Sequence, residues 1–171
     1  MSNQDAYNLS LLIARLWIGG IFLAHGIRHI FGGGKIAGTG RWFESLGVRP
    51  GIVHAWVASV AEVAAGAGLV LGFLTPLCAA AVIGTMLVAW ITNHWKNGFW
   101  IFHRPDEGYE YVMTLTFVGL ALGTIGPGEW SVDHAIWDKG QLIGTTGLWL
   151  SLLGALAALL LLATSWRPNR G

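Results

Sequence analysis

Five long apolar runs dominate the sequence and limit what it can fold into. Four of them meet or approach the roughly 20 residues that a helix needs to cross a bilayer, and one is somewhat short. The runs are 9–31, 52–74, 77–95, 109–125 and 142–164. Only 11% of the residues are charged, against about 25% in soluble domains. We therefore predict an all-α integral membrane protein: a bundle of four core transmembrane helices plus a fifth, C-terminal transmembrane helix.

Length, charge and cysteine content further limit the domain organisation and the partners that we expect. The 171 residues contain no charged or Ser/Pro-rich linker, so we expect a single membrane domain over 1–171. The leader MSNQDAYN has no basic residue, and the run after it is too long for the core of a cleavable signal peptide. A net charge of +1 gives no electrostatic reason to expect a nucleic-acid partner. The single cysteine, Cys78, is expected to be packed and inert.

The basic residues of the loops lie almost entirely on one side of this five-span arrangement. One side carries Lys139, and the other carries Arg28, Lys35, Arg41, Arg49, Lys96, Arg104, Arg167 and Arg170. Because basic loops stay in the cytoplasm, we expect the first and third loops and the C-terminus to be cytoplasmic. The N-terminus is then expected outside.

Polar residues appear where the first apolar run ends, in the stretch AHGIRHIFGGG (24–34). At 100° per residue, Arg15, His25 and His29 share an arc of about 80° on a helix, and Gly19 and Gly26 lie on the same face. Small residues beside polar ones are typical of a face that packs against other transmembrane helices. We therefore expect both histidines to point into the bundle. Small-residue faces would also permit a homo-oligomer.

The next helices carry polar residues at matching depth. Glu62 is expected ~15 Å along the second helix, near the middle of the membrane, where an unpaired carboxylate would cost several kcal/mol. We expect Arg15 to be its ion-pair partner. The candidate cavity is predicted to be lined by His25, His29, Glu62, His94, Tyr109 and Glu110. No metal site is predicted, because an HxxxH pair alone is weak evidence for one.

Three connecting segments carry weaker expectations. The glycine-rich segment 32–51 is expected to be a docking surface or a flexible cover over the cavity. The segment NGFWIFHRPDEGYEY (97–111), which includes His103, is expected to lie in the membrane interface as a short amphipathic stretch. In the segment 126–140, Asp133, His134 and Asp138 are expected to be solvated.

Five segments carry a family resemblance: LLIARLWIGGIFLAHG (11–26), VAEVAAGAGLVLGFLTPLCAAA (60–81), NHWKNGFW (93–100), GYEY (108–111) and GPGEWSVD (126–133). Together they resemble the DoxX family over about residues 9–133, and they include Arg15, Glu62, His94 and Glu110. The chain departs from the family in the histidine-rich end of the first helix, the glycine-rich segment after it and the added fifth span. The resemblance implies a small bacterial inner-membrane protein associated with redox chemistry. Relatives include the membrane subunit of a thiosulfate:quinone oxidoreductase and proteins induced by quinone or catechol stress.

Several functions remain open at this point. A quinone site would use histidine, tyrosine and carboxylate groups around an apolar slot. A haem could be held by His25 or His29 opposite His94. Buried charges also occur in small proton- or solute-coupled transporters. In the plainest alternative, the chain is a structural anchor for a soluble redox enzyme. We expect a membrane component or anchor of a redox or oxidative-stress pathway, with quinone as the first candidate ligand, and any oxidoreductase activity to need a second protein.

Overall fold

The computed structural model describes residues 1–102, 106–137 and 142–168. His103, Arg104, Asp138, Lys139 and Arg170 therefore lie outside the described residues. The helices are α1 (Asn3–Phe31), α2 (Lys35–Ser45), α3 (Gly51–Leu71), α4 (Thr75–Ala89), α5 (Glu110–Ile125), α6 (Val132–Ile136) and α7 (Gly144–Ser165). A π-helical turn (Trp90–His94) and a 3₁₀ turn (Trp95–Asn97) continue α4. The predicted all-α membrane fold is confirmed.

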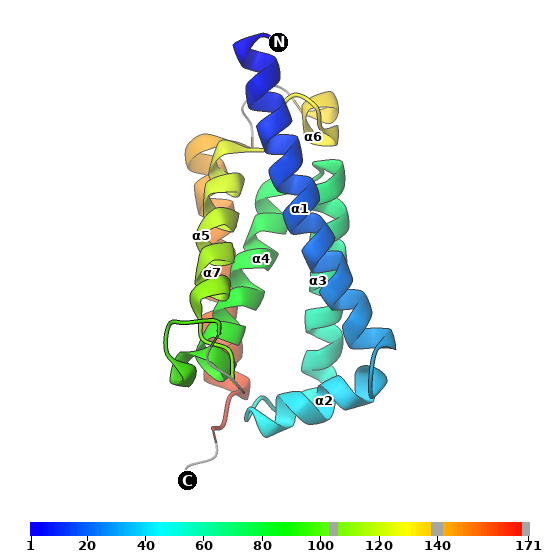
Figure 1. Ribbon diagram of the computed structural model, residues 1–171, viewed down its shortest axis with the longest axis vertical. Helices are drawn as coiled ribbons and strands as arrows, with labels where there is room; N and C mark the ends of the chain where they lie inside the picture. The colour runs from blue at the N-terminus through cyan, green and yellow to red at the C-terminus, as the bar shows by residue number, and fades with distance from the viewer. Residues whose placement is uncertain (103–105, 138–141, 169–171) are drawn as a thin grey trace.

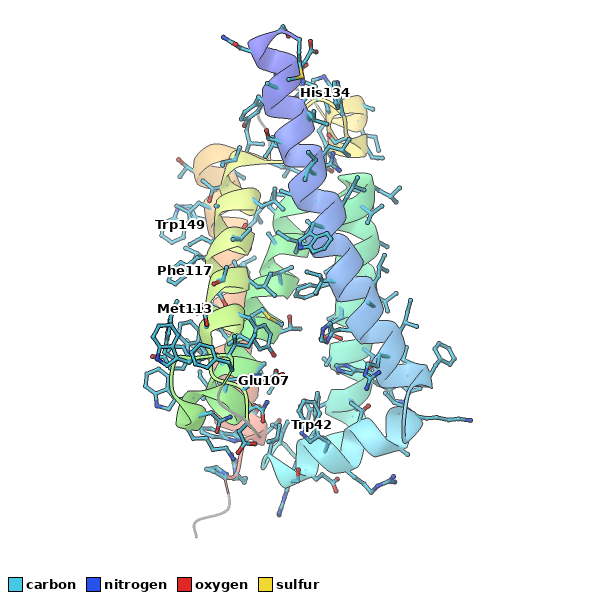
Figure 2. All side chains as sticks on the ribbon, in the orientation of Figure 1. Trp42, Glu107, Met113, Phe117, His134 and Trp149 are labelled. Atoms are coloured by element: carbon cyan, nitrogen blue, oxygen red, sulfur yellow. The ribbon has the colours of Figure 1, made fainter. Side chains whose placement is uncertain are left out.

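In the described part of the chain, four helices are long and apolar enough to cross a membrane: α1, α3, α7 and the continuous helix Thr75–Asn97. The predicted run 109–125 forms α5, which is shorter at 16 residues. Large apolar side chains cover the outside of the bundle, and Figure 2 shows Phe117 and Trp149 pointing away from it. The protein is therefore a multi-pass membrane protein whose outer surface contacts lipid.

The helices form two groups that separate toward one end (Figure 1). In the first group α1 packs along α3, with α2 lying across their lower ends; in the second, α7 packs along α4 and α5. The groups meet where α3 turns into α4, near α6. We call this the α6 end and the opposite one the α2 end.

Close packing of α1 on α3 depends on small residues. A Cβ added at Gly19 would lie 2.7 Å from the carbonyl oxygen of Gly66, and one at Gly26 would lie 2.9 Å from that of Ser59. Gly154 of α7 is pressed against the backbone of Ala80 in α4 in the same way. As predicted, Gly19 and Gly26 lie on a packing face, because only small residues let membrane helices approach so closely.

Arg15 joins elements at the α6 end and is fully buried. Its guanidinium donates to the carbonyl oxygens of Leu69 (3.1 Å) and Val70 (3.4 Å), in the last turn of α3, and to that of Trp130 (2.6 Å). A cation at a helix C-terminus satisfies free carbonyl groups and favours the helix dipole. Gly72 must lack a side chain here, since it has φ +65° and a Cβ would strike this guanidinium. The expected ion pair of Arg15 with Glu62 is therefore wrong.

Asp133 connects the same end to the start of α4. Its two carboxylate oxygens accept from the backbone N–H groups of Leu74 (2.7 Å) and Thr75 (2.9 Å). The residue is 6% exposed, so the expectation that it is solvated is wrong, whereas its neighbour His134 is exposed. Asp133 supplies from a distant segment the cap that the first residues of α4 lack.

The glycine-rich segment forms a helix rather than a flexible cover. Gly40 of α2 lies against the backbone of Ile52, and Glu44 accepts from the N–H of Gly51 at 3.1 Å. The chain after α2 then pairs with the C-terminal segment through an isolated antiparallel bridge between Val48 and Trp166. This bridge joins the two helix groups at the α2 end.

Candidate functional site

An apolar cavity of about 790 Å³ lies between the two helix groups. Helices α1, α2, α3, α4, α5 and α7 all contribute to its lining, and Trp42 rises from α2 toward it (Figure 2). Its polar lining residues are His25, His29, His54, Glu62, Thr85, Thr92, His94, Glu110, Tyr111 and Thr114. This volume falls in the range of sites that hold a drug-sized ligand.

The α1–α3 wall presents a histidine and a carboxylate to the cavity. The Nδ1 atom of His29 lies 3.1 Å from Oε2 of Glu62. Both atoms are buried, and neither makes a hydrogen bond of good geometry within the described residues. Glu62 itself is only 6% exposed. A buried polar pair without full hydrogen bonding is costly, which is typical of a group that meets a ligand or exchanges a proton.

His25 lies one helical turn before His29 on α1. The two rings approach edge to face, with centroids 6.4 Å apart. His25 is exposed and also lines the cavity, so it marks an opening of the cavity beside α1. His54 of α3 contributes a second buried imidazole nitrogen, Nδ1, without a hydrogen bond among the described residues.

The opposite wall holds His94 in a fixed orientation. Its Nδ1 lies 2.8 Å from the carbonyl oxygen of Glu107, and its Nε2 lies 2.9 Å from the Tyr111 hydroxyl and 3.1 Å from the Asn93 amide nitrogen. A carbonyl oxygen can only accept, so Nδ1 carries the proton and Nε2 is the acceptor. The Tyr111 hydroxyl therefore donates to His94.

A π-helical turn places His94 in this wall. Its extra residue shows as a hydrogen bond from the N–H of Trp95 to the carbonyl oxygen of Trp90, five residues back. Such turns rotate the following side chains and are frequent at functional sites. Within this turn the Asn93 amide nitrogen lies 3.1 Å from Nε2 of His94.

The sequence comparisons agree with this architecture. The DoxX family model matches residues 10–95, from α1 to the end of the π-helical turn, which includes Arg15, Glu62 and His94. The chain belongs to the DoxX family. A curated relative, the uncharacterized membrane protein Rv3486 of Mycobacterium tuberculosis (strain ATCC 25618 / H37Rv), is 26% identical over 146 residues, which cover 79% of this chain and 86% of the relative. No solved structure gives a significant match.

The DoxX chain brings together most, but not all, of the residues predicted for the cavity. His25, His29, Glu62, His94 and Glu110 line it. Tyr109 does not, and its placement in the lining is wrong: its ring stacks between Trp90 (5.4 Å between centroids) and Trp95 (5.5 Å). Tyr111 takes its place, because two residues correspond to about 200° around a helix.

The lining residues of the DoxX chain that were absent from the predicted set include His54, Trp42 and Phe43. His54 lies eight residues before Glu62, which puts both on one face of α3, so extending that face toward its start would have found it. Trp42 and Phe43 line the cavity from α2. Trp42 and Phe43 could not be assigned to the lining from the sequence, because the helix that carries them, α2, was not predicted.

Axial haem ligation by His94, the alternative considered for this DoxX chain, does not fit its surroundings. Both ring nitrogens already have partners, so a bond to iron would require breaking the contacts to Tyr111 and Asn93. Among the described residues, no three His, Cys, Asp or Glu side chains are grouped as a metal site. An apolar lining with a few polar groups is typical of sites that hold organic ligands.

Proposed function

We propose that the protein binds a lipid-soluble quinone in the cavity between its two helix groups and serves as a membrane component of a redox or oxidative-stress pathway. The observation that supports this most is the buried pair of His29 and Glu62 in the mainly apolar cavity, because Nδ1 and Oε2 of this pair have no hydrogen bond of good geometry among the described residues. A quinone needs an apolar slot for its ring, a hydrogen-bonding group near each oxygen and a group that exchanges protons near neutral pH.

The two walls supply these groups from opposite sides. His29 and Glu62 belong to the α1–α3 wall, whereas Glu110 and Tyr111 belong to the α5 side. The exposed face of His25 marks the opening beside α1 through which a ligand dissolved in the bilayer would enter. Glu62 would take or give the proton that accompanies a change in the redox state of the quinone.

A soluble redox enzyme is the partner that this function implies. A quinone held in the membrane exchanges electrons with a donor or acceptor, and the DoxX resemblance points to oxidoreductase systems. We propose that the chain anchors such an enzyme at its α2 end. Exposed Arg28, Lys35, Arg41, Arg49 and Lys96 make this end basic.

The same basic residues give the proposed orientation in the bacterial inner membrane. Because basic ends stay in the cytoplasm, the α2 end and the C-terminus would be cytoplasmic and the N-terminus outside. A C-terminal green fluorescent protein fusion is expected to fluoresce, and a C-terminal alkaline phosphatase fusion to be inactive. An active phosphatase fusion with a dark fluorescent fusion would reverse the orientation.

A binding titration tests the quinone site. Decylubiquinone added to the purified protein in lipid nanodiscs is expected to quench tryptophan fluorescence saturably, because Trp42 lines the cavity. The same titration is repeated with decylubiquinol, whose hydroxyl groups can donate to a carboxylate. Glu62→Gln keeps the shape of the side chain and removes its charge, so its Kd for decylubiquinol should rise about tenfold, as for loss of a hydrogen bond to a charged group.

Asp106→Asn is the matched control for this titration. Its side chain is exposed and does not belong to the cavity lining, so its Kd should equal that of the wild type. Quenching that never saturates, or the same Kd in Glu62→Gln and wild type, would contradict the proposal.

A further inference from the structure

The Tyr111 hydroxyl already donates a hydrogen bond to a partner inside the protein, His94. It lies 2.9 Å from Nε2 of His94, whose other nitrogen donates to the carbonyl oxygen of Glu107 at 2.8 Å. That second contact leaves Nε2 as an acceptor, so the tyrosine must be the donor. A hydroxyl has one proton and two lone pairs. Tyr111 therefore keeps accepting capacity and has no proton left to offer a ligand.

Three groups keep the Tyr111 hydroxyl donating to His94. The Glu107 carbonyl fixes the tautomer of His94, and the Asn93 amide nitrogen, 3.1 Å from Nε2, also favours an unprotonated nitrogen there. The His94 ring meets the Tyr111 ring edge to face, with centroids 5.0 Å apart, which fixes the relative position of the two rings. His94, Asn93 and Glu107 are thus positioning residues for the Tyr111 oxygen.

The facing wall also offers an acceptor. Oε2 of Glu62 is buried and has no hydrogen bond of good geometry among the described residues, although His29 is close. A carboxylate oxygen accepts hydrogen bonds when it is ionised. The cavity is therefore lined from two sides by oxygen atoms that can receive a hydroxyl proton, one on α3 and one on α5.

We infer that the cavity selects a ligand that carries hydroxyl groups, so that a hydroquinone or another lipid-soluble phenol binds more tightly than the corresponding quinone or ether. The ligand hydroxyl donates to the Tyr111 oxygen, while Tyr111 keeps its own bond to His94. A second hydroxyl across the ring would donate to Glu62. This inference rests on the proposed function of the cavity and specifies which redox form it prefers.

Two ligands that differ only in the hydroxyl proton test the inference. We would titrate the protein in nanodiscs with 4-nonylphenol and with 4-nonylanisole, using decylubiquinone in parallel. The wild type should bind the phenol about 3- to 10-fold more tightly than the anisole, the usual range for one hydrogen bond. Tyr111→Phe should bring this ratio to about 1 and leave anisole binding unchanged.

Tyr109→Phe is the matched control, because this tyrosine lies two residues away and stacks between Trp90 and Trp95 outside the cavity lining. It should keep the wild-type ratio. His94→Ala should lower the ratio, since Tyr111 would then point its proton elsewhere. Comparing ratios between variants cancels the different partitioning of the two ligands into lipid.

Two results would overturn the inference: equal phenol and anisole affinities in the wild type, or an unchanged ratio in Tyr111→Phe. Because the wild-type ratio needs no variant, the test does not depend on Tyr111→Phe folding well. If decylubiquinone still binds in either case, the cavity remains a quinone site without selection for hydroxyl groups. If none of the three ligands binds, the proposed function falls as well.

Discussion

Replacing Asp133 with alanine should lower the free energy of unfolding by about 2–4 kcal/mol, because it removes a helix cap and leaves one buried and one partly buried N–H group without an acceptor. Those groups belong to Leu74 and Thr75, at the start of α4. Loss of the carboxylate also removes a negative charge from the buried surroundings of Arg15. The change can be measured as a shift in SDS-induced unfolding of the protein in mixed micelles.

His134→Ala is the control for this substitution. Its side chain is exposed and the backbone is the only part of His134 with a hydrogen bond to Ser131, so its stability should stay within about 0.5 kcal/mol of the wild type. Equal stability of Asp133→Ala and wild type would show that Asp133 does not hold α4 to the α6 end. Asp133→Asn should fall between the two, since an amide keeps one acceptor oxygen.

Filling the cavity should abolish ligand binding. Ala58 lies on α3 one turn before Glu62, and it lines the cavity. In Ala58→Trp, the indole would occupy space that the ligand needs, so decylubiquinone should no longer quench tryptophan fluorescence saturably. The expected change is a Kd at least about 100-fold higher than that of the wild type, since an occupied site cannot bury the ligand.

Val60→Trp is the control for Ala58→Trp. It adds a tryptophan to α3 without filling the cavity. Val60 is 58% exposed and does not belong to the cavity lining, so its indole would face lipid. Its quinone affinity should match that of the wild type. Equal Kd values for Ala58→Trp and Val60→Trp would place the binding site outside this cavity.

The apolar pattern predicted the membrane helices well, because burial in lipid requires long apolar runs wherever the chain spans. It predicted the start of the first helix less well. α1 begins at Asn3, where Ser2 and Asp5 cap each other's backbone N–H groups, and this polar first turn carries no hydropathy signal. α2 was missed for another reason: its glycines are poor helix formers, and the helix is held by close contacts to α3.

Matching the depth of polar residues along the helices correctly predicted which of them lie in one region. It could not predict their ion-pair and hydrogen-bond partners, because these depend on tertiary contacts. The buried cation of Arg15 and the buried carboxylate of Glu62 suggested an ion pair by charge alone. In the folded chain the carbonyl groups at the end of α3 surround Arg15, and His29 is the group nearest Glu62. Neither the end of α3 nor the π-helical turn that orients His94 can be located from hydropathy, since both arise from backbone geometry.

Organic extraction of the purified protein tests the central claim most directly. Wild type, Ala58→Trp and Val60→Trp would be isolated from bacterial membranes in mild detergent, and quinone would be quantified per mole of protein. Near-stoichiometric quinone in the wild type and Val60→Trp, with only background amounts in Ala58→Trp, is the result that a quinone site in this cavity predicts. Background quinone in the wild type, or equal amounts in all three proteins, would contradict it.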